Sequence, residues 1–165
     1  MDENTRRLVA FVASQLVFVA ALIHVAVGAV NWIRWLSAGF LLPQDARWPV
    51  FVLSGLAVIV GIYAASRAEN RRPYYLAGVV VMLGYVVAYF GWHLGGHRLF
   101  LVAGPAAGNA ETITVQWFLD HLFAGAVEFV SILVETVAAV ALAVLYVTAG
   151  EQVSGDEPDD TGEEP

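Results

Sequence analysis

A small set of ionisable side chains lies inside long apolar stretches of this chain, and these residues are the best placed to do chemistry. They are four histidines and three acids: His24, His93, His97, His121, Asp120, Glu128 and Glu135. A charged residue at the centre of a membrane helix costs about 2.5–3.5 kcal/mol on insertion scales, so such residues usually mark a function or a buried pair. Imidazole and carboxylate groups can bind metal ions, pass protons or bond to each other.

The spacing of these residues indicates that they share helical faces. His121, Glu128 and Glu135 follow one another at steps of seven residues. Seven residues turn an ideal helix almost twice, with a drift of about 20° per step, so the three side chains would point the same way. His24 and Asn31 are also seven residues apart. We expect both polar faces to be buried between helices or against a partner, because lipid would expel them.

A metal or haem site is one interpretation of the histidines. His93 and His97 form an H-x-x-x-H pair, which puts two imidazoles on one helical face. With His121 and Asp120 they would form a site for a divalent metal such as zinc, iron or manganese. Alternatively, His24 and His93 from two helices would ligate the iron of haem b from both sides.

A proton path is a second interpretation. Four ionisable residues descend along one expected helix from the outer side of the membrane past its midplane: Asp120, His121, Glu128 and Glu135. Chains of this kind are typical of proton relays in pumps and transporters. The chain would then be a small proton-coupled transporter.

Helix packing is a third interpretation, and it needs no chemistry. Polar side chains in a membrane bond across helices and hold them together. We expect Glu128 to pair with His24, since both fall at a similar estimated depth. Gly28 and Gly125 would let the two helices approach closely.

The composition places these residues in a membrane protein. The chain has 165 residues, of which 59% are hydrophobic and only 14% are charged. Ordinary soluble domains are about 45–50% apolar and about 25% charged. This composition excludes a soluble globular enzyme, a disordered protein and a nucleic-acid binder. The absence of cysteine excludes disulfides, thiol catalysis and zinc–thiolate sites.

Hydropathy predicts an all-α integral membrane bundle of four helices. A helix needs about 20 mostly apolar residues to cross the hydrocarbon core. Four stretches meet this length, at residues 8–33, 48–66, 73–97 and 115–149. Residues 1–7 precede this transmembrane domain of residues 8–149. Residues 150–165 form an acidic tail that we expect to be disordered.

Arginine sets the expected orientation in the cell membrane. With the N-terminus inside, five arginines fall on the cytoplasmic side (Arg6, Arg7, Arg67, Arg71 and Arg72), and three fall outside (Arg34, Arg47 and Arg98). Positively charged residues favour the cytoplasmic side, so both termini are expected in the cytoplasm.

Lysine is absent, and 7 of the 15 acids lie in the last fifteen residues, a pattern that looks haloarchaeal and halophilic. Three segments carry a wider resemblance: Leu22–Asn31, Trp48–Gly55 and Arg72–Gly78. They resemble small uncharacterised four-helix membrane proteins of haloarchaea. The resemblance implies the four-helix topology, and it implies no activity.

The leading interpretation is a non-enzymatic membrane protein whose polar face mediates helix packing or association with a partner. That partner would be a second copy of the chain or another subunit of a membrane complex, within the lipid bilayer. A metal- or haem-binding redox protein is the alternative, and a proton-coupled transporter is the third interpretation. Nucleic acid is not an expected partner.

Overall fold

The computed structural model describes residues 1–41, 46–94 and 114–155, and all of their regular structure is helical. The predicted all-α bundle is therefore confirmed. Four helices are long and apolar enough to cross a membrane, and these make the chain a multi-pass membrane protein: Glu3–Ser37, Arg47–Arg67, Arg72–His93 and Ala126–Ala149.

The first helix, α1 (Glu3–Ser37), extends beyond the predicted span at both ends. Asp2 caps its start, because the carboxylate accepts hydrogen bonds from the backbone N–H and the hydroxyl of Thr5, at 2.9 and 2.6 Å. Its 35 residues measure roughly 52 Å along the axis at 1.5 Å per residue, more than a hydrocarbon core of about 30 Å. It ends before Gly39, whose φ of 88° is a conformation that glycine adopts without strain.

The next two helices follow the prediction closely. The second helix, α2 (Arg47–Arg67), differs from the predicted span by one residue at each end. The third, α3 (Arg72–Leu94), begins where the Asn70 side chain accepts a hydrogen bond from the N–H of Arg72 at 3.0 Å. Pro73 in its first turn has no N–H that would be left unpaired.

The fourth predicted helix is not continuous, and that expectation was wrong. A short helix, α4 (Val115–Leu122), ends before Gly125, and a new helix, α5 (Ala126–Gly155), begins. In an unbroken helix the carbonyl of His121 would accept from the N–H of Gly125. Instead that carbonyl accepts from the N–H of Ala124 at 3.4 Å and from the hydroxyl of Tyr89 in α3 at 2.6 Å. Glycine is also a poor helix former, which favours the break at this position.

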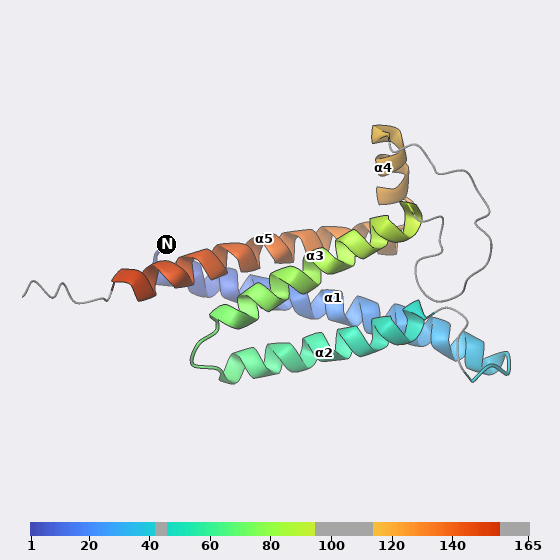
Figure 1. Ribbon diagram of the computed structural model, residues 1–165, viewed down its shortest axis with the longest axis horizontal. Helices are drawn as coiled ribbons and strands as arrows, with labels where there is room; N and C mark the ends of the chain where they lie inside the picture. The colour runs from blue at the N-terminus through green and yellow to red at the C-terminus, as the bar shows by residue number, and fades with distance from the viewer. Residues whose placement is uncertain (42–45, 95–113, 156–165) are drawn as a thin grey trace, which may run out of the picture.

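The long helices run side by side, and α4 crosses one end of the bundle (Figure 1). The start of α1, the turn between α2 and α3 and the end of α5 share the opposite end (Figure 1). α5 continues to Gly155, so the first residues of the tail expected to be disordered are helical. Helix α1 packs against both α2 and α5, and α3 packs on α5, whereas α2 and α3 touch little.

Small residues bring α1 and α5 together. The buried core contains Ala13 and Ala20 from α1, and Ala138 and Ala139 from α5. Small side chains let helix backbones approach closely, and this is the usual basis of helix packing in lipid. The polar residues near the middle of these two helices are thereby brought within contact range.

Candidate functional site

His24 lies buried near the centre of the bundle, with 7% of the residue exposed. Its Nδ1 bonds to the carbonyl of Ala20, one turn earlier in α1, at 3.0 Å. The ring stacks on Tyr85 of α3, with centroids 3.8 Å apart, and meets the edge of Phe51 of α2 at 4.9 Å. Contacts with α1, α2 and α3 therefore hold the imidazole in one orientation, and its Nε2 faces α5.

The fourth contact is Glu135 of α5, which is only 2% exposed. Its Oε1 lies 3.7 Å from Nε2 of His24. The same oxygen accepts a hydrogen bond from the hydroxyl of Ser131 at 2.6 Å, one turn earlier in α5. The distance to His24 is too long for a hydrogen bond, so the two groups face each other across the helix contact without one.

The partner of His24 is thus Glu135 and not Glu128, which corrects the sequence-based expectation. Helices α1 and α5 do pack together as expected. However, α5 begins only at Ala126, so Glu128 falls in its first turn and is exposed. The expected common face of His121, Glu128 and Glu135 fails for the same reason, because the helix is interrupted between the first two.

The two glycines expected between these helices have other neighbours. A Cβ on Gly28 would meet the carbonyl of Trp48 at 2.7 Å and the Cβ of Phe51 at 2.9 Å. Gly28 therefore permits close approach of α2, not of α5. Gly125 faces the carboxylate of Glu128, which folds back toward the start of its own helix. A carboxylate at this position is favourable, because it lies near the unpaired N–H groups of the first turn.

A cavity of about 640 Å³ lies beside the His24–Glu135 pair, and we name it the polar cavity. Its walls come from α1, α2, α3 and α5 and include many apolar side chains. Its polar and charged lining residues are His24, Arg47, Tyr85, Tyr89, His93, Glu128, Ser131 and Glu135. The cavity brings together four of the predicted site residues, His24, His93, Glu128 and Glu135, from three helices.

His93 and His121 form a second contact near the end of the bundle that α4 crosses. Their ring centroids are 4.7 Å apart, edge to face. Each ring bonds through Nδ1 to the carbonyl four residues earlier, at 2.8 Å in His93 and 2.7 Å in His121. The structure therefore brings two of the expected metal ligands together.

The other expected ligands do not join this contact. Asp120 accepts a hydrogen bond from the side-chain amide of Gln116 at 2.6 Å and is exposed. His97 lies outside the described residues. Within residues 1–41, 46–94 and 114–155, no group of three or more His, Asp or Glu side chains is close enough to hold a metal ion.

Asn31 is also separate from the buried pair. Its amide donates to the carbonyl of Val27 at 2.8 Å, and its oxygen accepts from Arg34 at 3.4 Å. It does not line the polar cavity. Its spacing of seven residues from His24 placed it on the right face of α1 but more than one turn beyond the site.

Two residues of the site were not predicted as members of it. Ser131 holds the Glu135 carboxylate, and its position four residues earlier on a helix is the signal that would have found it. Tyr85 stacks on His24, and its buried hydroxyl has no hydrogen-bond partner in the described part of the chain. No spacing rule within α3 predicts a contact with α1.

Comparisons with known proteins add no assignment. No protein-family model matches the chain, and neither a curated protein nor a solved structure matches it. The geometry of the site is therefore the basis for any functional conclusion.

Proposed function

We propose that the protein is a non-enzymatic, complex-forming membrane subunit in which the His24–Glu135 pair fixes the packing of α1 against α5. The observation that carries this proposal is the 3.7 Å contact between Nε2 and Oε1 at a site where both residues are almost fully buried. The pair joins two helices that are far apart in the sequence. Sliding or rotating either helix would separate the two groups.

A single proton, carried by one residue or the other, explains why this pair is tolerated. With one proton the two side chains are neutral in sum, whether the proton lies on the imidazole or on the carboxyl. Loss of this proton, or gain of a second, would leave a net charge buried among apolar side chains, which is costly. The pair is therefore suited to hold one arrangement of helices rather than to exchange protons continually.

A partner in the membrane would be recognised at the polar cavity. Site-specific photo-crosslinking tests this, with the photoreactive residue at Val127, which lines the cavity and is 52% exposed. Val87 is the matched control, because it is 69% exposed on α3 and does not line the cavity. Crosslinks to one defined protein from Val127 alone are expected. Equal crosslinking from both positions, or none from Val127, would contradict a partner at this cavity.

The orientation belongs to this proposal. Among the described residues, five arginines lie near the N-terminal end of the bundle and two, Arg34 and Arg47, lie at the other end, which supports cytoplasmic N- and C-termini. Accessibility reporters at Asp2 and Thr161 should report from the cytoplasm, and one at Gly108 from outside. The opposite pattern would reverse the orientation.

A metal- or haem-binding redox protein is the second candidate, and one observation favours it. His24 and His93 line the same cavity, and each fixes its ring by an Nδ1 bond to a backbone carbonyl. That arrangement is typical of histidines that bind a metal through Nε2. Absorbance in the Soret region and metal analysis of protein purified under mild conditions test it. His24→Ala or His93→Ala should remove a bound group, and Gln15→Ala, an exposed position, should not.

A further inference from the structure

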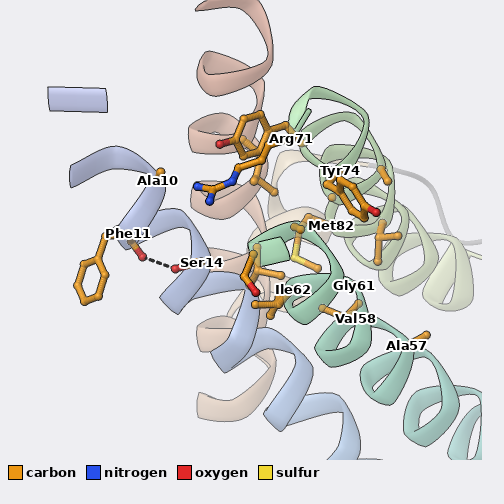
Figure 2. A pocket seen from close by; sticks show the side chains of 18 of the residues that line it. Ala10, Phe11, Ser14, Ala57, Val58, Gly61, Ile62, Arg71, Tyr74 and Met82 are labelled. Carbon is orange, nitrogen blue, oxygen red and sulfur yellow. Dashed lines mark hydrogen bonds between the residues drawn. The ribbon is translucent and has the colours of Figure 1, made fainter. Parts of the chain in front are cut away.

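A second cavity, of about 630 Å³, lies at the other end of the bundle, and we name it the apolar cavity. It is lined by the first half of α1, the second half of α2, the first half of α3 and Leu142 of α5, and it is partly open at the surface. Figure 2 shows its lining, which is mostly small and aliphatic, including Ala10, Ala57, Val58, Gly61 and Met82. The cavity exists because α2 and α3 touch little despite the short turn that joins them.

Arginine marks one end of this apolar space. Arg71, in the turn before α3, extends across the cavity end toward α1 near Ala10 (Figure 2). Its guanidinium makes no hydrogen bond or ion pair with any described residue. Arg7 also lines the cavity, but it pairs with Glu3 one turn earlier. Arg71 therefore supplies the net positive charge at the rim.

We propose that the apolar cavity binds one anionic phospholipid, with an acyl chain between α2 and α3 and the phosphate on Arg71. A guanidinium matches the geometry and charge of a phosphate group. Basic pockets between membrane helices are known to receive lipid headgroups. The apolar lining below the arginine provides the surface that an acyl chain buries.

The size of the cavity favours a lipid over a partner helix. A helix with its side chains is about 10 Å wide. The apolar cavity lies between α2 and α3, which are neighbours joined by a short turn, and it extends over only about half the length of each. A spanning helix is longer than this, whereas an acyl chain is only one methylene wide and fits a narrow space between helices.

Native mass spectrometry of the whole protein, released from nanodiscs of mixed phosphatidylglycerol and phosphatidylcholine, tests the proposal. The wild-type protein should retain one phosphatidylglycerol in preference to phosphatidylcholine. Arg71→Gln should weaken that preference about fivefold, the effect of one arginine at a membrane surface. Arg67→Gln is the matched control. Arg67 is the last residue of α2, near the same end of the bundle as Arg71, but its guanidinium lies over the ring of Tyr63 and it does not line the cavity. This substitution should leave the preference unchanged.

A second variant tests the place of the acyl chain independently of the charge. Gly61 has open space where a side chain would begin, so Gly61→Leu should fold normally and place a side chain in the path of the acyl chain. It should reduce retention of both lipids, and Gly84→Leu, equally open but outside the cavity, should not. Equal retention of both lipids by the wild type, or retained lipid in Gly61→Leu, would overturn the proposal. A dimer that Gly61→Leu converts to a monomer without lipid loss would show that a second copy fills the cavity instead, and would also overturn it.

Discussion

The two cavities have nearly the same volume and are both mainly apolar, yet they differ in their ionisable residues. Histidine, glutamate and one arginine, Arg47, line the polar cavity. The ionisable side chains that line the apolar cavity are two arginines and two tyrosines, and both arginines lie at its rim. Within the described residues, the buried ionisable pair lies where two helices each supply one member, and the arginines of the apolar cavity stay near the end of the bundle.

The largest effect should come from breaking the buried pair in the polar cavity. Glu135→Leu leaves His24 without its partner, and removal of one member of a buried pair costs about 3–5 kcal/mol. Unfolding in mixed detergent micelles measures this free energy. Glu128→Leu is the control on the same helix, because Glu128 is exposed and such substitutions usually change stability by less than about 0.5 kcal/mol. Equal losses in the two variants would contradict the distinction between the two glutamates.

A smaller loss of stability should distinguish a tightly packed glycine, Gly28, from a glycine beside open space, Gly61. Gly28→Val places atoms against the Trp48 carbonyl and Phe51, and overpacking of this kind costs about 1–3 kcal/mol. Gly61→Val extends into the apolar cavity, where nothing lies within 4 Å of the added Cβ, and should be close to neutral. Thermal unfolding of both variants in detergent gives the comparison. If Gly61→Val is the more damaging, the apolar cavity is not open.

Serine residues in the two cavities should respond differently. Ser131→Ala removes the hydrogen bond to the buried Glu135 carboxylate, with an expected loss of about 1 kcal/mol or somewhat more. Ser14 in the apolar cavity bonds only to the carbonyl of Phe11 in its own helix, at 2.7 Å, so Ser14→Ala should be nearly neutral. The same unfolding assay measures both. Equal changes would mean that Ser131 does not support the pair.

The smallest effect concerns the exposed end of α1. Hydrogen bonds from Thr5 hold the pKa of Asp2 below its ordinary value of 3.8. The stabilisation of the helix start is therefore complete at neutral pH and is lost as pH falls below about 4. Hydrogen exchange of the first amides of α1 should accelerate in acid. Asp2→Asn keeps a capping group and should remove this pH dependence; an unchanged acid response would assign it to another group.

Hydropathy was sufficient to predict the number of spanning helices and the bounds of the second and third. The predicted span of residues 48–66 is observed as Arg47–Arg67, because the apolar run and its flanking charges are both local features of the chain. The burial of Glu135 was also accessible from sequence, since an ionisable residue in a long apolar helix must find a partner. Glu135 could therefore be predicted as a site residue without knowledge of the three-dimensional structure.

Which glutamate contacts His24, in contrast, could be learned only from the three-dimensional structure. The expected pairing of His24 with Glu128 assumed one continuous helix from residue 115 to 149. At the break the Tyr89 hydroxyl donates to the His121 carbonyl, a contact across 32 positions that no periodicity reveals. Once α5 starts at Ala126, Glu128 lies in its first turn, and the glutamate two turns further along faces His24.

A double-mutant cycle on His24 and Glu135 tests the central claim most directly. His24→Leu and Glu135→Leu are made singly and together, and the free energy of unfolding is measured in micelles. A parallel cycle replaces Glu135 with Glu128. We expect a coupling of about 0.5–3 kcal/mol for His24 with Glu135, so that the double variant loses less stability than the sum of the two single variants, and additive effects for His24 with Glu128. Additive effects with Glu135, or coupling with Glu128 alone, would contradict the assignment of the buried pair.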